Sequence, residues 1–161
     1  MNIFYLSENV SDCAKFHNNK HCVKMILEYS QLLCTAHRFL DEENVISQDL
    51  YRLTHVNHPC SKWVRQSAEN YIWLYNLLIA LHEEYTHRYK REHKSKRLIP
   101  YLAELPKNIN KTNCFTNPPL AMPDYCKCDN PIEAYRKYYI KEKNHLSEWK
   151  NRDAPEWYMV S

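Results

Sequence analysis

The 161-residue chain contains no glycine. Glycine averages near 7% in proteins, so its complete absence removes whole classes of structure. The glycine loops that hold phosphates in P-loop and dinucleotide-binding proteins are excluded. A fold rich in tight β-turns is also disfavoured, because those turns rely on glycine. The sequence therefore favours an all-α protein.

Composition predicts one globular domain, with a core over residues 1–150 and a tail over residues 151–161. Hydrophobic residues make up 44% of the chain and charged residues 25%, which is ordinary for a folded domain. The longest apolar stretch, residues 71–81, is far shorter than the roughly 20 residues that span a membrane. Ser7, Glu8 and Asn9 interrupt any secretory signal. We therefore expect no membrane partner, while the oligomeric state stays open.

The charge and the cysteine content limit the cellular environments and the kinds of partner that we expect. The net charge is +3 and the isoelectric point is 8.4, below the value above about 9 that is typical of nucleic-acid-coating domains. A local basic groove remains compatible with these values. The seven cysteines are odd in number and fall mostly within helical patterns. We expect reduced thiols in a cytoplasmic compartment, within a host cell or a virion if the source is viral.

Hydrophobic periodicity predicts a small irregular helical bundle with a short N-terminal extended arm and a long proline-rich loop. Residues 3–6 form either a strand stub or the arm, and Asn9 or Ser11 caps the first helix. The other expected elements are a helix over 12–40, a polar loop over 41–54, a helix from His58-Pro59 to about 92, a short helix over 94–104 broken at Pro100, an ordered loop over 105–129, and a last helix from Asn130-Pro131 to about 150.

The first long helix carries one polar stripe on an otherwise apolar surface. The stripe consists of His17, Lys20, His21, Lys24, Glu28, Gln31 and Thr35. It is either a solvated face, with an ion pair between Lys24 and Glu28, or the wall of a cleft. In a cleft, the lone carboxylate of Glu28 among histidines and lysines suits acid–base chemistry.

A metal site is a further alternative for this helix. His17 and His21 have the spacing that lets two histidines share a metal, and Cys126 and Cys128 are able to complete a tetrahedral set. A metalloprotease requires glutamate directly after the first histidine, where this chain has Asn18. The cysteines are otherwise small apolar residues in the core and in a loop. We predict no metal and no cofactor.

The segment before the second long helix is rich in histidine. His55, Asn57 and His58 lie at a predicted helix N-terminus, where backbone amides and the helix dipole favour anions. Trp63 and Arg65 follow. Arg65 either binds a phosphate or carboxylate bidentately, or forms an ion pair with Glu69 on a solvent-exposed strip of the helix. The end of this helix and the last helix interleave basic and aromatic residues. That pattern suits backbone tracking and base stacking on DNA, or else a solvated helix end.

Several motifs together resemble a family of small uncharacterised proteins from phages and large DNA viruses. The resemblance covers nearly the whole chain and implies no activity. The motifs are His17-x-x-Lys20-His21-x-x-Lys24-Met25, Thr54-His-Val-Asn-His-Pro59 with Trp63, Glu84-Tyr-Thr-His-Arg88, Ala121-Met-Pro-Asp124 and Ala134-Tyr-Arg-Lys-Tyr-Tyr139.

The layout also resembles the pyrimidine-dimer DNA glycosylases of the phage endonuclease V type. The features that carry this resemblance are Ala14-x-x-His17, Glu28-Tyr29-x-x-Leu32, the Asn57-His58-Pro59 turn and the tail tryptophans Trp149 and Trp157. In that family the α-amine of the processed N-terminus attacks the sugar and a glutamate assists. The resemblance implies Glu28 as that glutamate, or places Gln31 there in another register. Asn2 disfavours removal of Met1, so Lys20 or Lys24 is an alternative amine.

We therefore expect an enzyme that acts on DNA or a nucleotide, most concretely a base-excising DNA glycosylase for damaged or modified bases, with or without lyase activity. Catalytic candidates are Glu28, Lys24, Lys20, His17 and His58. Candidates for substrate binding are His21, Gln31, His55, Asn57, Trp63 and Arg65. The alternatives are an enzyme for a small nucleotide or phosphate-bearing metabolite, and a non-enzymatic viral protein that binds a host factor.

Overall fold

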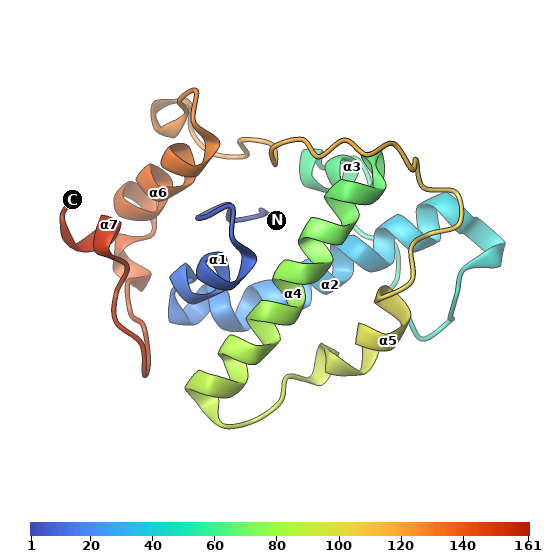
Figure 1. Ribbon diagram of the computed structural model, residues 1–161, viewed down its shortest axis with the longest axis horizontal. Coiled ribbons are helices and arrows are strands. Elements are labelled where there is room, and N and C mark those ends of the chain that lie inside the picture. Colours follow the sequence, from blue (N-terminus) through green and yellow to red (C-terminus); the bar gives the residue numbers. More distant parts are fainter.

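The computed structural model describes residues 1–161 and confirms the all-α prediction, with seven α-helices and no strands (Figure 1). The helices are α1 (Val10–Phe16), α2 (Asn19–Asp41), α3 (Pro59–Gln66), α4 (Ala68–Tyr89), α5 (Ile99–Leu102), α6 (Pro131–Glu142) and α7 (Glu156–Met159). Short 3₁₀ turns lie at η1 (Glu42–Asn44), η2 (Lys94–Leu98), η3 (Asp124–Cys126) and η4 (Asn144–Leu146).

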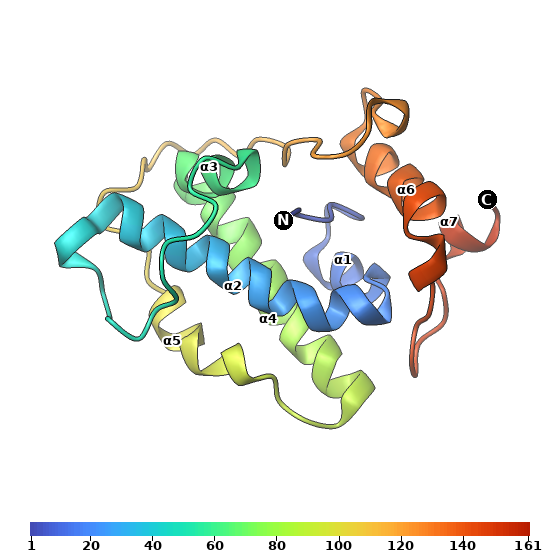
Figure 2. The ribbon, with the colours of Figure 1, turned by 180° about the vertical axis from the view of Figure 1, so that it is seen from behind.

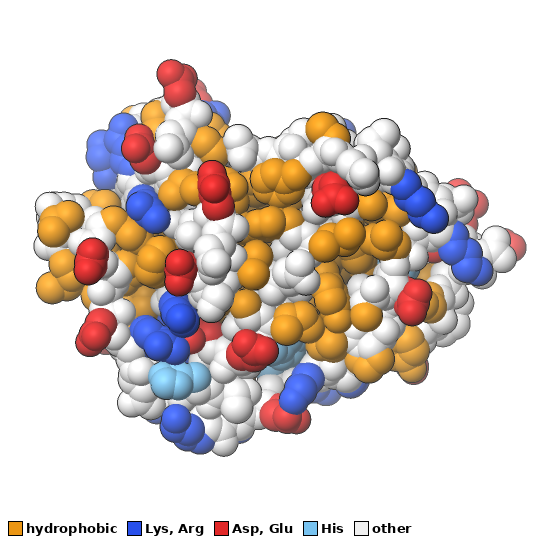
Figure 3. Space-filling view, in the orientation of Figure 1, with side chains coloured by type: hydrophobic (Ala, Val, Ile, Leu, Met, Phe, Trp, Pro, Cys, Tyr) orange, Lys and Arg blue, Asp and Glu red, His pale blue; other side chains and the backbone are white.

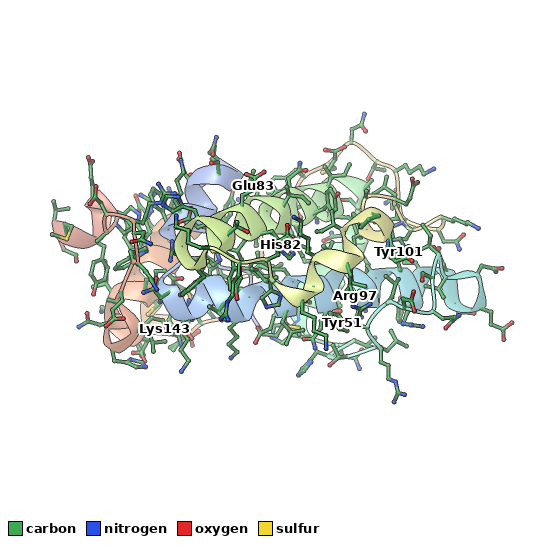
Figure 4. The ribbon with its side chains drawn as sticks, turned by 90° about the horizontal axis from the view of Figure 1, so that it is seen from below. Tyr51, His82, Glu83, Arg97, Tyr101 and Lys143 are labelled. Carbon is green, nitrogen blue, oxygen red and sulfur yellow. The ribbon has the colours of Figure 1, made fainter.

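The two long helices form the centre of the molecule. Figures 1 and 2 show α2 and α4 packed across each other, with α3 at one end of α4 and α1 beside its middle. The η2–α5 segment returns beside α2, and a long loop then leads to α6 and α7. One continuous hydrophobic core includes buried residues from the N-terminal arm through α6.

The predicted helix over 12–40 is wrong at residues 17–18, where the chain leaves one helix and begins another. The Asn18 side chain accepts a hydrogen bond from the backbone N–H of His21 at 2.9 Å, and so caps α2. Asparagine is a favoured N-cap because its short side chain satisfies a free amide of the first turn. His17 is consequently the C-cap of α1 rather than a member of the α2 stripe.

The second long helix is also interrupted. Ser67 is extended and separates α3 from α4, and its hydroxyl accepts from Asn70 N–H at 3.2 Å while donating to the Cys114 carbonyl at 2.9 Å. The cap therefore ties the long loop to the α3–α4 junction. The expected run to residue 92 ends at Tyr89, and Arg65 and Glu69 lie on different helices.

Two later boundaries differ from expectation. Pro100 lies in the first turn of α5, where proline is tolerated, rather than breaking a helix. The last long helix ends at Glu142 instead of about 150. The following segment bonds to the start of α2, since Asn19 donates to the Glu148 carbonyl and its side chain accepts from Lys150, both at 2.8 Å.

Residues 3–6 form an extended arm, all four of them buried, and not a strand. The backbone N–H of Phe4 donates to the Tyr29 hydroxyl at 3.1 Å. At the other end of the arm, Arg136 donates to the Leu6 carbonyl at 3.0 Å. The arm is therefore fixed between α2 and α6, which determines where Met1 lies.

A fully buried guanidinium joins four parts of the chain. Arg88 on α4 pairs with Glu84 at 2.8 Å and donates to the Lys15 carbonyl of α1 and the Asn19 side chain of α2. Arg152 from the tail also pairs with Glu84, at 2.8 Å. Burial acts to raise the pKa of Glu84, but hydrogen bonds from Arg152 and Arg88 bring it below its usual value.

We expect Glu84→Gln to destabilise the fold strongly, because it leaves the buried charge of Arg88 without a counterion. Removing one partner of a buried ion pair costs about 3–5 kcal/mol. Chemical denaturation should show this loss. The neighbouring Glu83→Gln is the matched control, since Glu83 is exposed and makes no ion pair. Equal effects of the two substitutions would contradict the proposed role of the buried pair.

Candidate functional site: an amine–carboxylate–imidazole cluster

The turn that precedes α3 is fastened to the middle of α2. The Thr35 hydroxyl donates to the Thr54 carbonyl and accepts from the Thr54 N–H, both at 3.3 Å. Gln31 and Glu28 occupy the same helix face as Thr35, one and two turns toward the N-terminus respectively. The histidine-rich turn and the carboxylate of Glu28 are thereby brought to one region.

His58 provides the cap of α3 with its own ring. Its Nδ1 accepts a hydrogen bond from the backbone N–H of Cys60 at 3.1 Å. Nδ1 must therefore carry the lone pair, which in the neutral ring leaves the proton on Nε2. The Nε2–H group makes no hydrogen bond within the protein and is free to meet a substrate.

Three groups act electrostatically on His58, and with it we call them the reactive cluster: Met1, Glu28, His55 and His58. Burial is the largest cause that lowers the pKa of His58 below its ordinary value. The Met1 ammonium and His55 lower it further, whereas the Glu28 carboxylate opposes them. Glu28 and His58, from separate predicted elements, therefore lie within electrostatic range.

The Glu28 carboxylate is largely sheltered but remains accessible. Its side chain is 15% exposed and forms an ion pair at 3.3 Å with Lys24, which is 61% exposed. This is the pair that the solvated-face interpretation predicted. A half-buried carboxylate beside an ammonium and a neutral imidazole is suited to moving or stabilising a proton.

His55 holds the turn in an unusual backbone conformation. Its φ is 48°, in the left-handed region that is uncommon for residues other than glycine. The turn is closed by the His58 N–H, which donates to the His55 carbonyl at 2.9 Å, and Thr54 Oγ1 bonds His55 Nδ1 at 2.7 Å. Such conformations persist where the surroundings hold them, often beside functional groups.

His17 and His21 lie in the core rather than on an open cleft wall. His17 is fully buried, and its Nδ1 donates to the Cys13 carbonyl at 2.7 Å. Its Nε2 therefore accepts from the Tyr29 hydroxyl at 2.8 Å. Burial lowers the pKa of His17 to about 4. Through its bonds to the Cys13 carbonyl and the Tyr29 hydroxyl, His17 helps to hold the N-terminal arm in place.

His21 is 5% exposed and lies between aromatic groups. Its Nδ1 is hydrogen-bonded to the Tyr139 hydroxyl at 2.7 Å, and its ring stacks on Phe4 with centroids 4.1 Å apart. Burial lowers its pKa to about 2. Both buried histidines therefore favour the neutral state.

The remaining candidates lie at three places. Lys20 is exposed and lines, with Lys24, a hollow that also includes Tyr89 and His93. Asn57 is exposed in the turn and Gln31 is half-buried on α2. Trp63 and Arg65 belong to a separate hollow along α3. The structure thus gathers Glu28, His55 and His58, and sets Trp63 and Arg65 apart.

Cysteine and histidine do not meet in a metal-binding arrangement. No group of three or more histidine, cysteine, aspartate or glutamate side chains is placed to hold a metal ion. Cys126 is buried, Cys128 is exposed, and all seven cysteines are free. The tetrahedral alternative that combined His17, His21, Cys126 and Cys128 is therefore not supported by the geometry.

Two contributors escaped the sequence analysis. Tyr29 orients both the arm and His17, yet in the sequence it belongs to an unremarkable apolar pattern. Asn2 follows Met1, and its side-chain oxygen is buried without a hydrogen-bond partner.

Comparison with known proteins found no matching family model, no matching curated protein and no matching solved structure. None of the helices combines the length and the apolar character needed to cross a membrane.

We expect stability to fall as the pH is lowered from 7 to 5, because His17 is held neutral in the fold. Its pKa is depressed from 6.5 to about 4, so the unfolded chain binds the proton first. The stabilisation from neutral His17 is present above the unfolded pKa and is lost below it, by about 2 kcal/mol at pH 5, and His21, whose pKa is also depressed, adds to the loss. Urea unfolding at the two pH values measures the loss.

His17→Gln should reduce this pH dependence, because glutamine does not titrate. His145→Gln is the control, since His145 is exposed and the slope should remain that of the wild type. An unchanged slope in His17→Gln would show that the loss has another source.

Proposed function

We propose that the protein is a DNA-acting enzyme, a base-excising glycosylase for damaged or modified bases with an imine-forming lyase step. The observation that supports this proposal is the amine–carboxylate pair of Lys24 and Glu28 at 3.3 Å, together with the electrostatic action of the Glu28 carboxylate and the Met1 ammonium on the His58 ring. An amine nucleophile assisted by a nearby acid–base group is the arrangement that imine chemistry requires. The base would have to leave the duplex stack to be reached.

The cluster contains the parts of a balanced reaction. The free amine attacks C1′ of the deoxyribose, and the C1′–base bond breaks with its electron pair going to the base. The His58 Nε2–H group donates a hydrogen bond that stabilises the negative charge of the departing base, which then takes its proton from water. The Glu28 carboxylate takes one proton from the attached amine and returns it to O4′ as the C1′–O4′ bond of the sugar ring breaks, which gives a protonated imine between the amine nitrogen and C1′.

The position of Met1 favours its amine over the lysines. Met1 is half-buried and acts electrostatically on His58, whereas Lys20 and Lys24 are exposed. Lys24 is the second candidate because it touches Glu28 at 3.3 Å.

Borohydride trapping with duplex DNA that carries one abasic site should yield a covalent adduct at Met1. Mass spectrometry of peptides from the adduct identifies the amine. Lys20→Arg and Lys24→Arg are the controls, and both should still be trapped at the N-terminal peptide. An adduct confined to Lys24 would transfer the role to that lysine, and the absence of any adduct would contradict the imine step.

Glu28→Gln should slow trapping about 100-fold, because general acid–base assistance typically contributes 10²–10⁴. The amide keeps the size of the side chain but cannot accept the amine's proton. The measurement is the single-turnover rate of adduct formation. Glu43→Gln is the matched control, since Glu43 is exposed in η1 and makes no ion pair. Equal rates in the wild type and Glu28→Gln would remove Glu28 from the mechanism.

A further inference from the structure

A hollow of about 580 Å³ lies along α3, beyond the reactive cluster. The residues that matter to it come from α2, from α3 and from the long loop. They are Phe39, Lys62, Arg65, Gln66, Thr116 and Asn117. Its volume is within the range of ligand sites.

Arg65 is held in place inside this hollow by two contacts. Its guanidinium carbon lies 4.1 Å from the centre of the Phe39 ring, and Nη1 donates to the Ser61 hydroxyl at 3.1 Å. A guanidinium that is already stacked and bonded has little conformational freedom left to lose on binding. Its Nε and Nη2 donors make no hydrogen bond within the protein.

The charge of the hollow is positive and uncompensated. Lys62 and Arg65 are its only charged lining residues, and neither belongs to an ion pair. The expected pairing of Arg65 with Glu69 does not form. Partial burial lowers the pKa of the Arg65 guanidinium, so an anion that satisfied it would be stabilised. The free face of the planar fork suits a phosphate.

The loop wall of the hollow is fixed, so its polar groups are preorganised. Thr116 accepts from the Asn70 side-chain amide at 3.0 Å and donates its N–H to the same side chain at 3.0 Å. The Trp63 indole N–H donates to the Thr116 carbonyl at 3.0 Å. The indole N–H of Trp63 therefore helps to fix the loop at Thr116.

The hollow begins at Pro59, next to His58, but Arg65 lies at the other end of α3, further from the reactive cluster than one nucleotide step. Arg65 is roughly 10 Å along α3 from His58, at 1.5 Å per residue. Phe39, which supports it, is roughly 16 Å along α2 from Glu28. Successive charges of one DNA strand are about 3.4 Å apart along the axis. The separation corresponds to about three to five nucleotide steps.

We infer that the Arg65 hollow binds a backbone phosphate of the DNA strand, about three to five nucleotides to one side of the nucleotide that reacts. The inference rests on the proposed function and adds to it a minimum substrate length. An oligonucleotide that reaches the hollow should bind well, whereas a shorter one should not. The contact is charged and independent of base identity.

The test measures binding to duplexes that contain one abasic-site analogue and are truncated stepwise on one side or the other. Fluorescence anisotropy should show wild-type affinity falling about tenfold at one truncation step, three to five nucleotides from the analogue, on one side only. Arg65→Gln should bind long duplexes about tenfold more weakly and show no such step. Its salt dependence should be shallower by about one phosphate contact.

Lys111→Gln is the matched control, because Lys111 is an exposed loop residue outside the hollow and its loss removes the same charge. It should retain the length step. Arg65→Lys keeps the charge but loses the planar fork, and should retain only part of the affinity. Thermal melting shows whether each variant is folded, and Arg65→Lys replaces Arg65→Gln if the latter is not.

The outcomes separate this inference from the proposed function. A length step that persists in Arg65→Gln, or no step in the wild type, overturns the phosphate subsite even where borohydride trapping succeeds. A step that depends on Arg65, found without any trapped adduct, supports the subsite and contradicts the glycosylase. Tight binding of inorganic phosphate or of a mononucleotide through Arg65, without any length step, overturns the subsite in favour of a small phosphate ligand.

Discussion

The fold depends on the buried charge of Arg88, because that side chain bonds three helices at one buried point. Its guanidinium bonds Glu84 on its own helix, the Lys15 carbonyl of α1 and the Asn19 side chain of α2. The Lys15 carbonyl is available only because α1 stops at Phe16, which leaves the last carbonyls of the helix without partners. The break between α1 and α2 and the burial of Arg88 therefore require each other.

The same break supplies the support for the N-terminal arm. Once the chain turns inward, His17 meets Tyr29, whose hydroxyl also accepts from the Phe4 backbone. Every donor and acceptor in this short chain of bonds is matched only while His17 is neutral, and its complete burial keeps it so. Folding thus carries the arm across α2, and brings the Met1 ammonium into the neighbourhood of His58 and Glu28.

Sequence patterns predicted the helical class, the arm and the start of α3, since these follow from glycine content, apolar periodicity and the His58-Pro59 signal. They did not predict the interruptions at Asn18 and Ser67. Both residues are favoured N-caps, but they also occur inside helices, so the pattern alone does not place an interruption there; at Ser67 a long-range bond to the Cys114 carbonyl supports the cap. The sequence identified Glu28 and His58 as candidate site residues. It did not predict that they lie near each other, because that depends on the long-range bonds between Thr35 and Thr54.

A chain without glycine has to recognise anions in a particular way. Glycine loops bring several backbone amides close to a phosphate, and no segment here permits that approach. Even the first amides of α3 are partly occupied, since His58 caps the Cys60 N–H. Recognition then falls to side chains that are fixed by their neighbours, as Arg65 is by Phe39 and Ser61. The Arg65 side chain extends outward from α3. The anion site that it forms is therefore separate from the turn that holds His55 and His58. Under the proposed function, a substrate that contacts both places is extended and regularly charged, as a DNA strand is.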